Sequence, residues 1–153
     1  MALYLVQHGK SLSKDVDPQQ GISEEGQADI DRIAAVARNY GIRVAEIFHS
    51  GKKRALQTAE IFAAAFDMPG KMTARDGLKP LDDVAVCAES LNAGDDLMLV
   101  GHLPFMEKLT SYLVAGDPKI TVFKFQNGGI VCLDQRADDL SWHIKWALMP
   151  HIG

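Results

Sequence analysis

Three short segments of the chain place reactive side chains directly after apolar runs. They read LVQHG at residues 5–9, IFHSGKKR at 47–54 and LVGHLP at 99–104. Two of them contain a histidine next to a glycine, His8 and His102, and the other one ends on Arg54. Glycine lets a ligand approach the backbone closely, and free N–H groups at a helix N-terminus favour anions. Two imidazoles and one guanidinium at one edge would suit a phosphoryl group attacked by a nitrogen nucleophile.

The apolar runs that precede these segments predict buried strands at residues 3–6, 44–49 and 97–100. Helical spacing predicts a helix capped by Ser23 and stopped at Gly41, and further helices at 54–66, 83–91 and 104–114. In open α/β sheets, ligands bind beyond the carboxyl ends of the strands. We therefore expect the three segments to meet at one edge of a sheet.

The last part of the chain has a different pattern. Residues 120–125, 129–134 and 141–147 each predict a strand, with turns at 127–129 and 137–139. The whole order predicts one domain over residues 1–153, a three-layer α/β/α sandwich whose mostly parallel sheet gains antiparallel strands at its C-terminal end. Trp142 and Trp146, four residues apart, are expected to share one face of the last strand.

Composition sets limits on the function. The 153 residues are 47% hydrophobic and 24% charged, as in one globular domain. The net charge of -4 argues against a general nucleic-acid binder but allows a small positive pocket. No apolar run approaches the ~20 residues of a membrane span, and the N-terminus lacks the basic region of a signal peptide. We expect a cytoplasmic protein in which Cys87 and Cys132 are buried thiols without a disulfide.

These segments resemble the histidine phosphatase superfamily, whose fold is phosphoglycerate mutase-like, and within it the small SixA-type phosphohistidine phosphatases. The family's Arg-His-Gly is matched by residues 7–9, its Leu-Thr-x-x-Gly by 22–26, its Ser-Pro-x-x-Arg-Ala-x-Gln-Thr-Ala by 50–59 and its Gly-His-x-Pro by 101–104. The tryptophan-containing end of the chain, residues 142–150, resembles the last strand of the SixA group. The resemblance covers nearly the whole chain, with the motifs in the same order.

The resemblance implies a role for each matched residue. His8 would be the nucleophile that accepts the phosphoryl group as phosphohistidine, which water then hydrolyses. Arg54 and His102 would bind the phosphoryl oxygens and stabilise the charge of the transition state. The family needs no metal and no other cofactor, and the histidines of this chain lack metal-ligand spacing.

One departure from the family pattern concerns phosphate binding, because Gln7 stands where the family has arginine. A glutamine amide carries no charge, whereas a charge-assisted hydrogen bond contributes about 1.5–3 kcal/mol. We therefore expect activity lowered by roughly 10²–10³-fold, by analogy with lost oxyanion donors, unless a lysine restores the charge. Lys10 is the first candidate and joins Gln7, Arg54 and His102 as a phosphate-binding residue; Lys52 and Lys53 are alternatives. Gly51 also replaces the family's proline, which should loosen the loop before Arg54.

The general acid is a second open point. Asp82 and Asp83 are candidates, but both also fit the start of a helix as N-cap and first-turn acid. A phosphoramidate has a good leaving group once its nitrogen is protonated, so a missing acid would favour phosphohistidine over phosphoesters. His49, at the end of the second predicted strand, is either a contact to phosphate or substrate or a packed polar residue.

Three functions fit the sequence. The first is a phosphatase acting on phosphohistidine of a protein such as a phosphotransfer domain, because no insertion is long enough to form a lid over a small substrate. The second is a phosphatase for small phosphoesters. The third is a non-catalytic module that binds phosphate or a phosphoprotein, suggested by Gln7. None of them involves nucleic acid or a membrane as partner.

Overall fold

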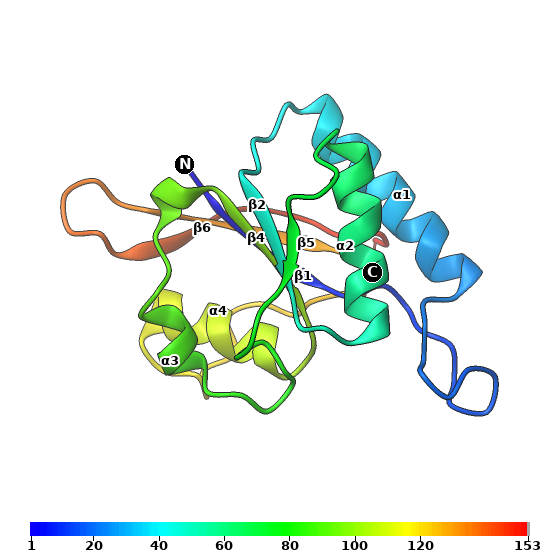
Figure 1. The fold of residues 1–153 in the computed structure, drawn as a ribbon. Helices are drawn as coiled ribbons and strands as arrows, with labels where there is room; N and C mark the ends of the chain where they lie inside the picture. Colours follow the sequence, from blue (N-terminus) through cyan, green and yellow to red (C-terminus); the bar gives the residue numbers. More distant parts are fainter. Residues whose placement is uncertain (153) are drawn as a thin grey trace.

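Six strands form one sheet in the computed structural model, which describes residues 1–152 (Figure 1). The strands follow the order β3-β2-β4-β1-β5-β6 across the sheet. Their bounds are Leu3–Gln7 for β1, Glu46–His49 for β2, Met72–Ala74 for β3, Leu97–Gly101 for β4, Ile130–Gln135 for β5 and Trp142–Leu148 for β6. The strands β1 to β4 pair in parallel, whereas β5 pairs antiparallel with both of its neighbours, β1 and β6. The predicted mixture of parallel and late antiparallel strands is therefore confirmed.

Helices cover both faces of this sheet. The pair α1 (Glu24–Asn39) and α2 (Lys53–Ala65) lies on one face, and α3 (Val84–Ala88) with α4 (Phe105–Ala115) lies on the other (Figure 1). Alternate residues of β1 serve the two cores, because successive strand side chains point to opposite faces. Tyr4 and Val6 pack towards α1 and α2, while Leu3 and Leu5 pack towards α3 and α4. This confirms the three-layer α/β/α prediction. Within residues 1–152, no helix is both long and apolar enough to cross a membrane.

Two predictions about strands are wrong. Residues 120–125 form no strand; Phe125 instead donates its backbone N–H to Glu107 Oε2 (3.1 Å) and packs edge-on against Phe123. Both edges of β5, the strand that follows this segment, are taken by β1 and β6, and the segment packs on the α3–α4 core instead. Conversely, the short edge strand β3 was not expected, because three residues are too few to show a period. The helix predicted at 83–91 is also shorter and spans only Val84–Ala88.

The two tryptophans of β6 lie on different faces, contrary to prediction. The pairing of β5 with β6 shifts between Cys132 and Leu133, which face Trp146 and Ile144 and leave Lys145 as an extra residue. Such a bulge reverses the alternation of side chains along a strand. Trp146 therefore packs on the α1–α2 core and Trp142 on the α3–α4 core.

The start of α1 packs directly against the loop that follows β1. Ser23 caps the helix by accepting the Gly26 N–H (3.1 Å), and its own N–H donates to the Lys10 carbonyl (2.8 Å). A Cβ atom at Gly26 would collide with that same carbonyl. This close approach explains why residues 22–26 carry a glycine at their end, and it holds the loop after His8 against the helix.

We expect Gly26→Ala to destabilise the fold by about 1–3 kcal/mol, because the added methyl overpacks a backbone contact. This loss should exceed the gain of about 1 kcal/mol in helix propensity that alanine brings. Urea denaturation of the variant and of wild type measures the difference. Gln27→Ala, on the exposed side of the same turn, is the control and should stay within about 0.5 kcal/mol. Equal stability of Gly26→Ala and wild type would contradict the packing argument.

Candidate active site

His8, His102 and Arg54 come together at the carboxyl ends of the parallel strands. His8 follows β1 and His102 follows β4, and these strands pair with Gln7 beside Gly101. The two imidazole centroids are 5.0 Å apart. Arg54 lies in the first turn of α2, and its positive charge acts on the pKa of both rings. The structure thus unites the three residues that the strand ends predicted.

Two hydrogen bonds tie the His8 loop to the turn that carries Arg54. The Gly9 N–H donates to Thr58 Oγ1 (2.9 Å), and the Thr58 hydroxyl donates to the Arg54 carbonyl (2.7 Å). Thr58 is fully buried and follows Arg54 by one helical turn. Asn127 Nδ2 also donates to the His8 carbonyl (3.0 Å). Sequence reasoning gave Thr58 and Asn127 no role at the site; the four-residue spacing from Arg54 was the available signal for Thr58.

The hydrogen bonding of His8 fixes which of its nitrogens can react. Nδ1 lies 2.7 Å from the Gly9 carbonyl, which only accepts hydrogen bonds, so Nδ1 carries the proton and Nε2 keeps a lone pair. Burial and, to a smaller extent, the charge of Arg54 together lower the pKa of His8 to about 4, against the opposing effect of the hydrogen bond to Gly9. The ring is therefore neutral at neutral pH, as a nitrogen nucleophile must be.

This pKa leads to a direct prediction. Because burial disfavours the charged ring, the His8 ring protons should titrate with a midpoint near pH 4 rather than at the ordinary value of 6.5. The shift also means that stability contributed by the neutral ring is lost as pH falls from 6.5 towards 4, since the unfolded chain takes up the proton first. Proton NMR of the imidazole signals measures the midpoint. A midpoint at or above 6.5 would contradict the desolvated geometry.

His102 is held by a hydroxyl that sequence analysis did not single out. Its ring is 1% exposed, and its Nε2 lies 2.6 Å from Ser50 Oγ. Ser50 Oγ also accepts the Lys52 N–H (3.4 Å); we assign its hydroxyl proton to His102 Nε2, which places the ring hydrogen on the unpartnered Nδ1. Burial lowers the pKa of His102 to about 3, with further lowering by His8, Arg54 and Lys52, so the ring is neutral.

Two buried polar atoms at this edge have no protein partner. They are Gln7 Oε1 and His102 Nδ1, and no other buried side-chain N or O atom of the non-exposed residues within 1–152 lacks one. Gln7 is the last residue of β1, and His102 directly follows Gly101, the residue of β4 that pairs with Gln7. Buried polar groups in proteins are nearly always hydrogen-bonded. We therefore expect a polar ligand to complete the hydrogen bonding at these neighbouring strand ends.

The three candidate lysines differ in their surroundings. Lys10 Nζ bonds Glu25 Oε2 (2.7 Å), which raises the Lys10 pKa, and the pair is solvent-exposed. Lys53 forms an ion pair with Asp17 (2.8 Å). Lys52 is exposed, and its charge acts on His102. Compensation for the missing arginine by Lys10 stays a prediction, and the geometry favours Lys52 as the nearer source of charge.

The two aspartates proposed as general acid serve the backbone. Asp82 Oδ2 accepts the Lys79 N–H (2.8 Å), and Asp83 Oδ1 caps α3 by accepting the Ala85 N–H (2.9 Å). Asp83 takes the N-cap role that the sequence allowed, whereas Asp82 lies in the turn before the helix and neither aspartate is a first-turn acid. A general-acid role for either aspartate stays a prediction.

His49 supports the loop that leads to Arg54. It is buried, burial lowers its pKa, and its Nδ1 accepts the Gly51 N–H (3.1 Å). Gly51 adopts a φ of 90°, which proline cannot reach, and proline would also lack the donated N–H. The glycine in place of the family's proline thus gives this loop its own hydrogen bond to His49.

One cluster of metal-binding residue types occurs within residues 1–152, away from these strand ends, and it is already internally paired. Glu25, Asp29 and His151 place donor atoms within 4.8 Å of one another. Asp29 bonds both Arg32 (3.0 Å) and His151 (3.0 Å), while Glu25 bonds Lys10. The carboxylate charges are therefore neutralised by the protein's own cations.

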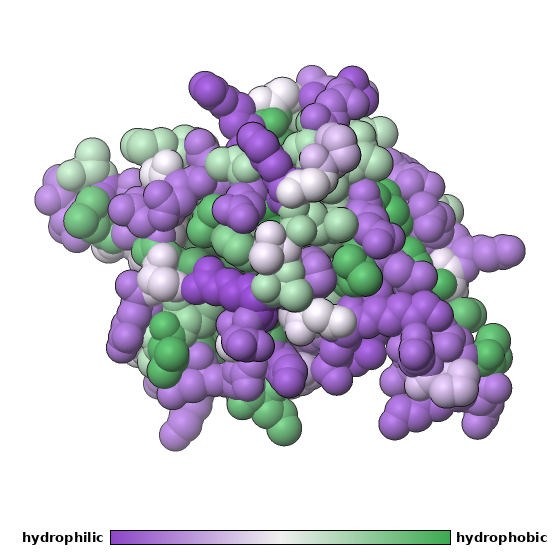
Figure 2. Space-filling model, viewed as in Figure 1, coloured by the Kyte–Doolittle hydropathy of each residue, from purple (hydrophilic) through white to green (hydrophobic). Residues whose placement is uncertain are grey.

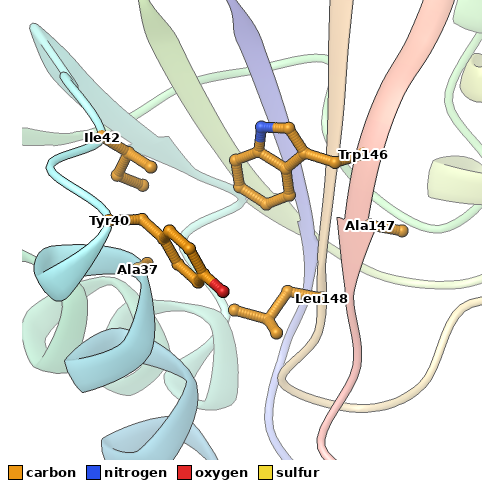
Figure 3. A pocket seen from close by; sticks show the side chains of 6 residues that line it. All are labelled: Ala37, Tyr40, Ile42, Trp146, Ala147 and Leu148. Carbon is orange, nitrogen blue, oxygen red and sulfur yellow. The ribbon is translucent and has the colours of Figure 1, made fainter.

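An apolar groove of 470 Å³ lies elsewhere, between the end of α1 and β6. Tyr40 and Ile42 face Trp146 and Leu148 across it (Figure 3). No histidine or arginine lines it, so it does not form part of the candidate active site. On the face seen in Figure 2, hydrophilic residues surround small separate apolar groups, in keeping with a charged surface.

A sequence model of the histidine phosphatase superfamily (branch 1) matches residues 3–83, more than half of the chain. The chain therefore belongs to the histidine phosphatase superfamily. The matched segment includes His8 and Arg54, whereas His102 lies beyond it. A comparison with curated protein sequences finds no match.

Solved structures share the fold over nearly the whole length. The protein histidine phosphatase SixA complexed with tungstate is 19% identical, with a TM-score of 0.81 over 98% of this chain and 97% of that one. The putative phosphohistidine phosphatase SixA from Agrobacterium tumefaciens is 26% identical, with a TM-score of 0.75 over 97% of both chains. A phosphoserine phosphatase mutant from Entamoeba histolytica is 14% identical, with a TM-score of 0.70 over 98% of both. The expected phosphoglycerate mutase-like fold is thereby confirmed.

Proposed function

We propose that this protein is a phosphatase in which His8 Nε2 attacks the phosphoryl group. The observation that carries the proposal is the neutral His8 ring, anchored through Nδ1 on Gly9, with its centroid 5.0 Å from that of His102 and with the charge of Arg54 acting on it. In the first step the Nε2 lone pair forms an N–P bond while the bond from phosphorus to the leaving group breaks. In the second step water attacks phosphorus, the N–P bond breaks, and inorganic phosphate leaves with His8 restored.

The surrounding residues supply charge and hydrogen-bond donors to this transfer. Arg54 offers a permanent charge and a fork of N–H donors to the phosphoryl oxygens. His102 offers its Nδ1–H, which Ser50 orients through Nε2. Because these donors are held by buried contacts before substrate binds, they stabilise the charge of the transition state without reorganisation.

We further propose that the substrate is phosphohistidine on a protein. Asp82 and Asp83 are engaged with the backbone, which supports a reaction that needs no dedicated acid. A phosphohistidine leaves as a neutral imidazole once its ring nitrogen is protonated, whereas an ester must release an alkoxide or take a proton from an acid. The SixA proteins of similar fold are named for this substrate class. The second candidate is a small phosphoester, since a phosphoserine phosphatase shares the fold.

A comparison of substrates tests this assignment. We expect kcat/KM to be at least tenfold higher for a phosphohistidine-bearing protein than for phosphoserine or para-nitrophenyl phosphate, with phosphate release as the readout. Preference for an ester would reject the phosphohistidine substrate and keep the phosphatase. Binding of the phosphorylated protein without any release of phosphate would instead support the non-catalytic binding module.

Ser50 should affect the reaction chiefly through His102, because its hydrogen bond to that ring (2.6 Å) is much shorter than the one it accepts from the Lys52 N–H (3.4 Å). We expect Ser50→Ala to lower kcat by about tenfold, because the His102 ring loses the hydrogen bond that sets its tautomer. Ser50→Thr keeps the hydroxyl and should recover most of the rate. Imidazole nitrogen NMR of His102 should show mixed tautomers in the alanine variant only. Unchanged kcat and an unchanged His102 spectrum in Ser50→Ala would show that this hydroxyl has no positioning role.

A further inference from the structure

The backbone on the N-terminal side of His8 is held by main-chain hydrogen bonds. The His8 N–H donates to the Gly101 carbonyl (2.9 Å), and the Gln7 carbonyl accepts the Gly128 N–H (2.9 Å). These two bonds continue the pairing of β1 with β4 and with β5. Because every residue has a main-chain carbonyl and every residue except proline has an N–H, they do not depend on which side chains are present.

The backbone on the C-terminal side of His8 is held by two side chains instead. The His8 carbonyl accepts a hydrogen bond from Asn127 Nδ2 (3.0 Å), and the Gly9 N–H donates to Thr58 Oγ1 (2.9 Å). Both bonds are made to the same peptide group, which is planar, so together they fix the rotation of that plane. Thr58 belongs to α2, whereas Asn127 belongs to the segment that precedes β5. The orientation of the His8–Gly9 peptide therefore depends on the identity of two residues that are distant in the sequence.

This peptide group determines the place at which the His8 ring is anchored. His8 Nδ1 donates to the Gly9 carbonyl (2.7 Å), which belongs to the next peptide group along the chain. The backbone at Gly9 packs closely against α1, where a Cβ atom would collide with the side chain of Ile30. A rotation of the His8–Gly9 peptide would move Gly9 and its carbonyl, and the ring would turn with its hydrogen-bond acceptor. The His8 ring is thus coupled to Asn127 through the backbone.

Asn127 is held in place by a tight turn and by the segment that follows β6. The Gly129 N–H donates to the Gln126 carbonyl (3.1 Å), and Gly128 has a φ of 81°, as the third residue of a type II turn requires. The Gln126 side chain forms two hydrogen bonds with the backbone of His151: Nε2 donates to the carbonyl (3.0 Å), and Oε1 accepts the N–H (3.0 Å). Gln126 therefore anchors the turn that carries Asn127.

We propose that Asn127 is a positioning residue for the nucleophile, because its amide fixes the His8–Gly9 peptide on which the orientation of the His8 ring depends. The proposal rests on the proposed function in that it takes His8 Nε2 to be the attacking atom. The donors to the phosphoryl oxygens are held by contacts that do not involve Asn127. We therefore expect Asn127 to affect the rate of attack by His8 and not the affinity for the phosphoryl group, since a misplaced reacting group lowers kcat even where binding is intact.

Two substitutions at Asn127 test this role. Asn127→Ala removes the donor and should lower kcat by about tenfold, with KM and the Kd of inorganic phosphate within about threefold of wild type. Asn127→Asp keeps the size but places a carboxylate against the His8 carbonyl, so its kcat should be lower still, by about 30-fold or more relative to wild type. Lys124→Ala, at an exposed position in the same segment, is the control and should have the kcat of wild type. Hydrolysis of the phosphorylated substrate and calorimetry with phosphate give these values.

The nitrogen NMR spectrum of the His8 ring tests the coupling without any turnover. In wild type the ring should hold its proton on Nδ1 alone, because the Gly9 carbonyl accepts it. In Asn127→Ala the ring should show a mixture of tautomers, which a loss of stability alone would not produce in the folded protein. Gln126→Ala keeps Asn127 and removes only the anchor of its turn, so it should show the same change with a kcat about threefold lower than wild type. This second variant keeps the test available if Asn127→Ala does not fold.

The outcomes distinguish this inference from the proposed function. Wild-type kcat with an unchanged His8 spectrum in Asn127→Ala would overturn the positioning role and leave His8 as the nucleophile. A loss of phosphate affinity equal to the loss of kcat would also overturn it, because the effect would then lie in binding. If wild type released no phosphate from any phosphorylated substrate, the proposed function would fail. The ring spectra would still decide the coupling, since an unchanged spectrum in both variants would overturn it and mixed tautomers would support it.

Discussion

His8→Ala is expected to reduce phosphate release by about 10⁴-fold or more, because no other group within the described residues combines a free ring nitrogen with this position beside Arg54. The remaining donors, Arg54 and the His102 Nδ1–H, do not depend on the His8 side chain. Binding of inorganic phosphate should therefore survive within about tenfold, which separates loss of the nucleophile from loss of the site.

A matched control for this variant exists on the sheet edge. His143 lies exposed on β6, so His143→Ala removes an imidazole without touching the strand ends. Its rate should equal that of wild type. If His8→Ala kept more than about a tenth of the wild-type rate, His8 would not be the nucleophile. The proposed reaction would then be wrong, although the description of the fold would still hold.

Arg54→Met is expected to lower kcat/KM by about 10²–10³-fold, the effect of removing an oxyanion donor together with its charge. The loss should be larger here than in a site that also has a second arginine, because Gln7 is uncharged. Arg54→Lys should recover only part of the rate, since an ammonium lacks the planar fork. The variants are compared by kcat/KM on the same phosphorylated substrate.

A second readout tests whether Arg54 acts where the structure places it. Its charge lowers the pKa of His8, so Arg54→Met should raise the midpoint of the His8 titration above about 4. Arg38→Met is the control, because Arg38 is exposed on α1 in an ion pair with Asp67 (3.0 Å). An unchanged His8 midpoint with an unchanged rate in Arg54→Met would remove Arg54 from the site.

The sequence predicted the parts of the fold that rest on local patterns. Buried parallel strands are continuous apolar runs, and the helices between them have clear caps and periods, so β1, β4 and α1 could be placed. The position of His8 and His102 at strand ends then followed from the general location of ligands in open sheets.

What could not be predicted depends on contacts between distant residues. The pattern of residues 120–125 is typical of a strand, yet the segment packs on the α3–α4 core, where Phe125 donates its N–H to Glu107. The extra residue in β6 moves Trp142 to the other face, and an insertion of this kind leaves no period to detect. Register and edge occupancy are properties of the assembled sheet.

The residues of the site divide in the same way between those that local patterns predict and those that depend on distant contacts. Residue types and motif spacing pointed to His8, Arg54 and His102. Ser50 and Thr58 act through hydroxyl hydrogen bonds to residues far away in the sequence, His102 and Gly9, and the spacing of Thr58 from Arg54 points only to its contact within the helix. Lys10 was an obvious source of charge in the sequence, but Glu25 of α1 pairs with it.

The charge of the whole chain and the charge of the pocket are separate quantities. A net charge of -4 describes the surface, where six of the sixteen lysines and arginines pair with carboxylates within residues 1–152. The strand ends combine Arg54 with two neutral rings and an uncharged Gln7.

Trapping the phosphoenzyme tests the central claim most directly. Wild type is mixed with a phosphorus-labelled phosphohistidine substrate and denatured in alkali within the first turnover, and the labelled peptide is mapped. Our account predicts an acid-labile, alkali-stable label on His8, attached at Nε2, and no label in His8→Ala. A label on another residue, or turnover without any labelled enzyme at the earliest times, would contradict it.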